Sequence, residues 1–100
     1  MSLLDKARWN AARKQYELGE NWRVKLWRCK ERMRCEQESC KFDEVDVDAV
    51  HGIAVQIIGG GKQTKRSIPV DKLEWFGGNV KEIVEGMLEE RMETQRGVLV

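Results

Sequence analysis

The sequence lacks any apolar run close to the roughly 18 residues that a membrane-spanning helix needs, and its first residues lack the apolar stretch of a secretion signal. We therefore expect no membrane contact and a cytoplasmic location. The sequence also lacks a large excess of positive or negative charge, because 18 Lys and Arg residues offset 17 Asp and Glu residues and leave a net charge of +1. The net charge thus neither indicates nor excludes the binding of nucleic acid.

The sequence also has few of the residues that build metal centres or nucleophilic sites, with three cysteines and one histidine. Cys29, Cys35 and Cys40 are an odd number without a CxxC pair, which favours free thiols over disulfides or a zinc site. His51 stands on the apolar side of a strand-like pattern, which indicates a core residue rather than a catalytic one. We therefore predict a non-enzymatic protein with no metal and no cofactor.

The chain has 100 residues, 41% of them hydrophobic, which is enough for one compact domain, 1–100, and too little for two. Its charge is divided along the sequence. Residues 1–41 hold eleven basic and six acidic residues, whereas residues 42–100 hold seven basic and eleven acidic ones. This polarity predicts a two-faced surface, a contact between the two halves, or a head-to-tail contact between copies.

Helical spacing dominates the N-terminal part of the chain. Its apolar residues recur at steps of three, four or seven and so lie on one helical stripe: Leu4, Ala7, Ala11, Leu18, Trp22, Leu26, Cys29 and Met33. Gly19 allows either one long helix or two helices joined by a turn, and we prefer the turn. Residues 22–30 also alternate in the manner of a strand, but the alternation fails at Trp27. Because residues 25–40 contain no Gly, Pro or β-branched residue, we favour helix there, with the strand as the alternative.

The middle of the chain has the spacing of a β-hairpin. Residues 44–58 change to a period of two, which predicts a strand. Three glycines follow, and a loop of four residues, 59–62, would pair Ile53 with Ile68 and keep the apolar faces of the two strands together. We therefore expect an antiparallel pair with this register.

From residue 80 onward the pattern is helical again. Asn79 and Glu82 have capping-box spacing, and the apolar residues that follow form one broad face, which is expected to cover the sheet. The predicted fold class is therefore α+β: an N-terminal helical region, an antiparallel β-hairpin or small meander, and a C-terminal amphipathic helix packed on the sheet.

The most informative segment is WRVKLWRCKERMR, residues 22–34, which sets six cationic side chains and one Glu among two tryptophans. Cations beside flat rings suit a partner that offers both negative charge and faces for stacking, such as nucleic acid. If the segment is helical, Arg23, Trp27, Lys30 and Arg34 share one stripe. The predicted binding residues are Arg23, Trp27, Arg28, Lys30, Arg32 and Arg34, with secondary contacts at Lys62, Lys65 and Arg66.

We predict from this segment a nucleic-acid-binding or regulatory module, or alternatively a small adaptor or inhibitor that binds an acidic or apolar protein surface. A remote alternative is a metal-dependent hydrolase, supported only by Glu44, Asp46 and Asp48 on one face of the predicted strand. The helical stripe is long for a monomer of this size and so also predicts a homo-oligomer. The residues predicted for self-association are Leu18, Trp22, Leu26 and Met33.

Overall fold

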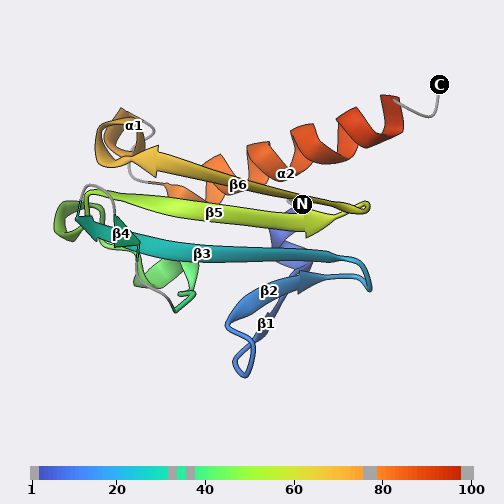
Figure 1. Ribbon diagram of the computed structural model, residues 1–100, viewed down its shortest axis with the longest axis horizontal. Coiled ribbons are helices and arrows are strands. Elements are labelled where there is room, and N and C mark those ends of the chain that lie inside the picture. Colours follow the sequence, from blue (N-terminus) through green and yellow to red (C-terminus); the bar gives the residue numbers. More distant parts are fainter. Residues whose placement is uncertain (1–2, 32–33, 36–37, 76–78, 98–100) are drawn as a thin grey trace.

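A computed structural model describes residues 3–31, 34–35, 38–75 and 79–97 of the chain. Six antiparallel strands form one sheet, and a C-terminal helix packs on it (Figure 1), which confirms the predicted α+β class. The strands are β1 (Arg8–Asn10), β2 (Gln15–Leu18), β3 (Trp22–Glu31), β4 (Arg34–Cys35), β5 (Gly52–Gly59) and β6 (Lys62–Pro69). Their order in the sheet is β1-β2-β3-β5-β6, and β4 pairs with β3. The helical elements are the 3-10 turns η1 (Leu3–Lys6), η2 (Phe42–Glu44) and η3 (Val47–Ala49) and the helices α1 (Val70–Trp75) and α2 (Val80–Gly97).

The predicted N-terminal helical region is wrong beyond a single turn, because η1 is followed by strands. Residues 22–30, for which we favoured helix, belong to the long strand β3, so the alternative is correct. Val24 and Leu26 alternate along β3 and are fully buried, and β3 pairs with β2 and β5. Burial of an alternating apolar face between neighbouring strands therefore outweighs the helix propensity of this segment.

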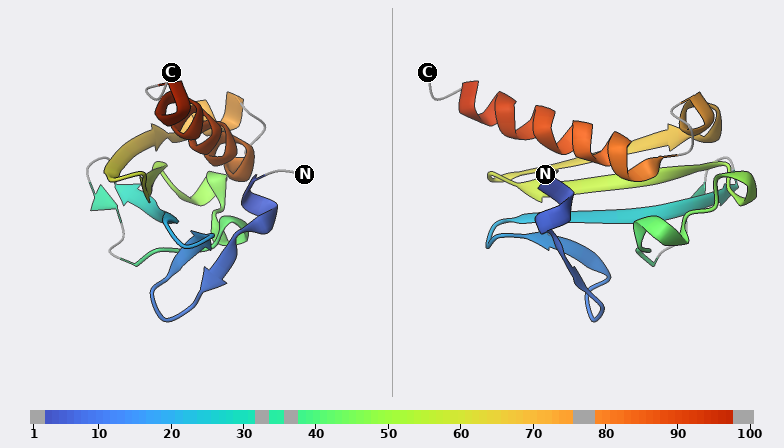
Figure 2. Two further views of the ribbon diagram at one scale, coloured as in Figure 1. Left: turned by 90° about the vertical axis from the view of Figure 1, so that its right-hand side faces the viewer. Right: turned by 180° about the vertical axis from the view of Figure 1, so that it is seen from behind.

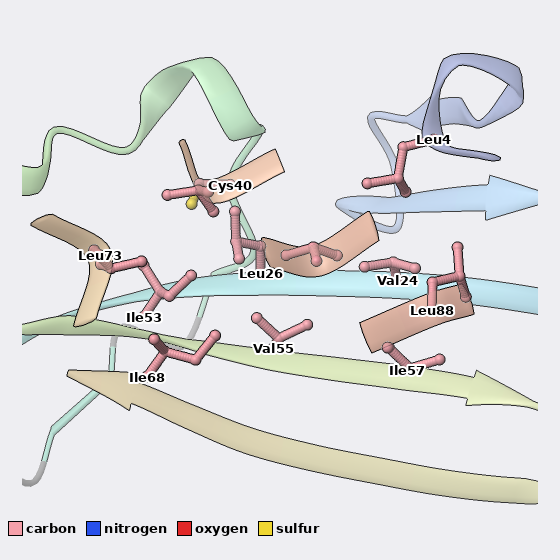
Figure 3. Packing of buried hydrophobic residues seen from close by; sticks show 12 residues of the cluster. Leu4, Val24, Leu26, Cys40, Ile53, Val55, Ile57, Ile68, Leu73 and Leu88 are labelled. Atoms are coloured by element: carbon pink, nitrogen blue, oxygen red, sulfur yellow. The ribbon is translucent and has the colours of Figure 1, made fainter. Parts of the chain in front are cut away.

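The hydrophobic core lies between one face of the sheet and α2 (Figure 3). The strands contribute Val24, Leu26, Val55 and Ile57, among others, and α2 contributes residues at helical spacing. Those residues are Val80, Val84 and Leu88, and together they confirm the predicted amphipathic helix. No helix in the described part of the chain is long and apolar enough to cross a membrane.

The turn η1 is tied to α2 from the other end of the sequence. Asp5 accepts a hydrogen bond from the ammonium of Lys81 at 2.5 Å, and the carboxylate of Glu85 accepts the backbone N–H groups of Leu3 and Leu4. These contacts satisfy N–H groups at the start of η1 that have no partner within the turn. They place η1 and α2 on the same side of the sheet (Figure 2).

The β5–β6 hairpin has the predicted register, with Ile53 opposite Ile68. Its loop is shorter than expected, because Gly59 pairs with Lys62 and leaves two residues in the turn. These residues, Gly60 and Gly61, both have positive φ angles, of 61° and 77°, as a tight type I′ turn requires. Glycine adopts this conformation without the steric cost that a side chain would add.

The predicted strand over residues 44–58 begins only at Gly52, since the residues before it form η2 and η3. The carboxylate of Asp46 accepts a hydrogen bond from the backbone N–H of Asp48 at 3.1 Å and so caps η3. Acidic side chains that bond the nearby backbone in this way favour turns over strands. His51, predicted as a core residue, is exposed; its backbone N–H donates to the carbonyl of Cys29, and its carbonyl accepts from the backbone N–H of Val70.

The prediction of three free cysteines is also wrong. Cys29 and Cys35 form a disulfide, whereas Cys40 is a buried thiol outside any disulfide. On a helix these two cysteines would lie on different stripes. The β3–β4 hairpin instead makes Cys29 and Cys35 direct cross-strand partners, which is the arrangement that lets a short loop close.

Candidate nucleic-acid interface

The two faces of the sheet differ in chemistry. One face carries the core and is covered by α2 and η1, and no helix of the described chain lies over the opposite face, which we call the outer face. In Figure 1 the strand β6 passes in front of α2, and from behind, in Figure 2, α2 lies in front, so the view of Figure 1 looks onto the outer face. Because successive side chains of a strand point to opposite faces, the pairing register decides which residues meet there.

Polar, basic and aromatic side chains meet on the outer face in three rows that run across β3, β5 and β6. In the first row Arg23 is opposite Ile58, and Ile58 is opposite Gln63. In the second row Lys25, Gln56 and Lys65 are neighbours. In the third row Trp27, Ala54 and Ser67 are neighbours. The outer face therefore combines one large aromatic ring with three cations and two amides.

Trp27 and Lys65 form the centre of the outer face. The ammonium of Lys65 lies 5.4 Å from the centroid of the Trp27 ring, within the range of a cation–π contact. Ala54 is directly opposite Trp27 and has no exposed surface, although it lies on the open side of the sheet. A methyl group in that position is covered by neighbouring side chains.

The carboxylate of Glu17 lies beside the cations of β3. Glu17 is directly opposite Arg23 in the β2–β3 pair. The pKa of Glu17 is lowered, mainly by hydrogen bonds from the side-chain amides of Gln15, at 2.9 Å, and Asn10, at 3.0 Å, and further by nearby arginines. Glu17 is therefore ionised at neutral pH and offsets part of the positive charge of Arg23.

Two open depressions lie at the two ends of the outer face. The first has a volume of about 610 Å³ and lies beside the Gly60–Gly61 turn, where Ile58 and Gln63 line it. The second has a volume of about 630 Å³ and is lined by the Cys29–Cys35 disulfide, together with Ser67 and other residues. A third hollow, of about 310 Å³, is lined by Glu17, Glu20 and Arg23, so the outer face carries several open hollows rather than one closed pocket.

The predicted binding residues are only partly brought together. Arg23 and Trp27 share the outer face, because they are four residues apart on one strand. Arg28 is half-buried on the opposite side of β3, across from Ile53, and Lys30 lies beyond the irregular pairing that follows Cys29. The guanidinium of Arg34 is 3.9 Å from the carboxylate of Glu31, and Arg32 lies outside the described residues. The helical stripe of Arg23, Trp27, Lys30 and Arg34 therefore does not exist.

The predicted secondary contacts divide in the same way. Lys65 is on the outer face, beside Trp27, whereas Lys62 and Arg66 point to the side of the sheet that carries α2. Lys25 and Gln56 were not among the predicted binding residues, and they lie between Arg23 and Trp27 on one side and Lys65 on the other. Lys25 could have been found from the sequence, because Arg23 and Lys25 alternate with apolar residues, and this alternation predicts a strand with both cations on one face.

The residues predicted for self-association do not form a surface stripe. Leu26 is fully buried in the core, and Leu18 and Trp22 pack against that core while partly exposed. Met33 lies outside the described residues. The helical stripe was an effect of the helix assignment, and of the described residues of this set only Leu18 and Trp22 are partly exposed.

The acidic residues of the predicted strand, Glu44, Asp46 and Asp48, are separated from the outer face. Glu44, Asp46 and Asp48 lie in or next to the 3-10 turns, so the acidic strand face that supported a hydrolase does not form. In the described residues no group of three or more His, Cys, Asp or Glu side chains is placed to hold a metal ion. The helix α2 carries exposed acidic side chains on the other layer of the molecule: Glu82, Glu89, Glu90 and Glu93. The polarity of the sequence thus corresponds to a basic sheet face and an acidic helix layer.

The sequence matches no protein-family model, and comparison with curated proteins and with solved structures finds no similar protein. The arguments for function therefore come from the geometry and charge of the chain itself.

Proposed function

We propose that the protein is a non-enzymatic nucleic-acid-binding or regulatory module and that its outer face binds the nucleic acid. The observation that carries the proposal is the position of the Lys65 ammonium, 5.4 Å from the centroid of the Trp27 ring. Arg23 and Lys25 lie on the same face. An aromatic ring for stacking and cations for phosphates are the two contacts that nucleic acids use most.

The small number of cations sets the expected salt dependence. Binding through Arg23, Lys25 and Lys65 neutralises about three phosphates, which predicts a slope of log affinity against log salt of roughly −2 for a single strand. The affinity should then fall by about 20-fold between 50 and 200 mM salt. Binding that does not change with salt would contradict a role for these side chains.

Two neighbours on β6 provide a matched test of the face. Lys65 points to the outer face, and Arg66, the next residue, points to the other side of the sheet. Lys65→Gln should weaken the binding of a fluorescein-labelled oligonucleotide and reduce the salt slope by about one unit, whereas Arg66→Gln should leave both unchanged. Equal losses in the two variants, measured by fluorescence anisotropy, would mean that the outer face is not the binding surface.

A second candidate function is a protein-interaction module, and one exposed tryptophan favours it. Trp75 at the end of α1 is 81% exposed, and tryptophans are enriched at the centres of protein interfaces. In this case a purified partner should bind in a fixed stoichiometry, and Trp75→Ala should abolish binding while Lys65→Gln does not. A shift of nucleic acid in the same preparation would argue for the outer face instead.

The location and the oligomeric state belong to the proposal as well. A cytoplasmic location stays a prediction, and the Cys29–Cys35 disulfide counts against it because cytosolic thiols are usually kept reduced. Thiol alkylation of the protein immediately on cell lysis would report the natural state of this pair. Light scattering on purified protein would test the predicted homo-oligomer.

A further inference from the structure

We infer that the ligand of the outer face is a single strand of nucleic acid, with one unpaired base stacked on Trp27. This inference rests on the proposed function and specifies its substrate class. In a duplex both faces of each internal base are already stacked on neighbours, and only base edges are open in the grooves. A ring such as Trp27 therefore gains a stacking partner from an unpaired base and gains none from the interior of a duplex.

Trp27 is half-buried on the outer face, and Lys65, whose ammonium lies over its ring, is exposed. A base can reach the ring where Lys65 now lies, 5.4 Å from the ring centroid. A flexible lysine side chain moves aside at low cost, because its charge prefers water or a phosphate to an aromatic face. An incoming base takes the position over the ring, and the Lys65 ammonium then contacts a phosphate of the same strand.

The spacing of the other groups fits a strand that runs along β3. Arg23 and Trp27 are four residues apart, which corresponds to about 13 Å at the rise of a β-strand. Lys25 lies between them, so cations for phosphates accompany the ring over the length of a few nucleotides. Gln56 is next to Lys25 and Lys65 and offers both a donor and an acceptor to the edge of a neighbouring base.

The width of the outer face argues against entry into a duplex groove. Four strands lie side by side, β2, β3, β5 and β6, and at about 4.8 Å per strand their backbones span about 14 Å. The major groove is about 12 Å wide and admits a helix or a two-stranded ribbon. The described chain has neither a helix nor a free ribbon on this side, so a duplex would reach the cations only through its backbone.

The test compares single strands with a duplex and uses a tryptophan off the face as control. The probes are fluorescein-labelled oligouridine, oligothymidine and a blunt duplex, each about eight nucleotides or base pairs long, within the range covered by small single-strand-binding domains. Anisotropy at 50 mM salt is measured for the natural sequence and for Trp27→Ala, Trp27→Phe, Trp75→Ala and Lys65→Gln. Circular dichroism shows whether each variant is folded.

We expect the single strands to bind at least about tenfold more tightly than the duplex. Loss of one stacked base should weaken single-strand binding by roughly 5- to 150-fold in Trp27→Ala. Trp27→Phe keeps a ring and should retain most of the affinity, and Trp75→Ala should retain all of it. Equal affinity for oligouridine and oligothymidine supports stacking and phosphate contacts common to RNA and DNA, and a preference for oligouridine supports an added contact to the 2′-hydroxyl.

Two results would overturn the inference. If the duplex binds as tightly as the single strands, or if a folded Trp27→Ala binds normally while Lys65→Gln is weakened, the outer face binds nucleic acid without stacking on Trp27. The proposed function would then stand and the inference would fail. If none of the three probes binds, both are wrong.

Discussion

The substitution Gly59→Ala tests how closely β3 and β5 are packed at the turn end of the sheet. A Cβ atom added at Gly59 would lie 2.2 Å from Cε3 of Trp22 and 2.3 Å from its Cδ2. Carbon atoms in good contact are about 3.5–4.0 Å apart, so the ring would have to move by more than about 1 Å. Trp22 packs against the core and is only partly exposed, so this movement disturbs its neighbours.

We expect Gly59→Ala to lower the free energy of unfolding by about 2 kcal/mol, within the range of about 1–3 kcal/mol for overpacked sites. For a chain of this size this loss corresponds to a fall in melting temperature of about 8–16 °C. Chemical denaturation followed by circular dichroism measures the free energy directly. It also avoids relying on the fluorescence of Trp22, whose surroundings the substitution changes.

Gly86→Ala is the matched control, because nothing lies within 4 Å of a Cβ atom at this position in α2. Alanine is favoured over glycine inside a helix by about 1 kcal/mol, so this variant should be more stable than the natural protein. Opposite effects of the same substitution at Gly59 and Gly86 would confirm the packing of Trp22. A loss below about 0.5 kcal/mol in Gly59→Ala would refute it.

Three further predictions follow from other contacts. The Cys29–Cys35 disulfide closes a loop with a sequence separation of 6, so its reduction should lower the free energy of unfolding by about 2 kcal/mol. Denaturation with and without dithiothreitol measures this loss, and an unchanged midpoint would mean that the disulfide constrains the unfolded chain little. Glu17→Gln removes the carboxylate opposite Arg23 and should tighten oligonucleotide binding by roughly two- to five-fold in anisotropy titrations, whereas weaker binding would show that Glu17 orders the site. Burial raises the pKa of Tyr16 above its ordinary value of 10.0, so the folded protein keeps the phenol proton to higher pH than the unfolded chain. The contribution of Tyr16 to stability is therefore complete below pH 10 and is lost as the pH rises through the pKa of the folded protein. Because Tyr16 is the only tyrosine, the absorbance of its phenolate reports the midpoint of this titration. A midpoint at or below 10.0 would contradict the burial of Tyr16.

The elements that the sequence predicted correctly are those whose signals are local. The helix α2 follows from its apolar spacing and from Asn79, whose side chain accepts the backbone N–H of Glu82 at 3.2 Å. The β5–β6 register follows from the glycine turn, since the expected four-residue loop and the observed two-residue turn both bring Ile53 opposite Ile68. In both cases residues close in sequence determine the structure, so the pattern alone was sufficient.

The elements that the sequence missed depend on distant partners. Residues 22–30 contain good helix formers and become a strand because β2 and β5 pair with them on both sides. The Cys29–Cys35 disulfide was missed for the same reason, because it requires the β3–β4 hairpin. His51 was misplaced because the strand was started too early, at residues that instead cap 3-10 turns. Assigning a helical period to residues 22–30 thus also led to the wrong prediction for the cysteines and to the predicted helical stripe for self-association.

Only some of the predicted binding residues lie on the outer face, and the error came from the interpretation of Trp27. In the sequence Trp27 is where the strand alternation fails, and we took that failure as evidence for helix. In the structure the strand continues, and Trp27 is a large aromatic side chain on the face that carries no core. A break in an otherwise consistent pattern tends to mark a functional or strained position, because the rest of the fold does not require it. In the proposed function Trp27 stacks on a base, and the Lys65 ammonium beside its ring and the cations along β3 contact phosphates.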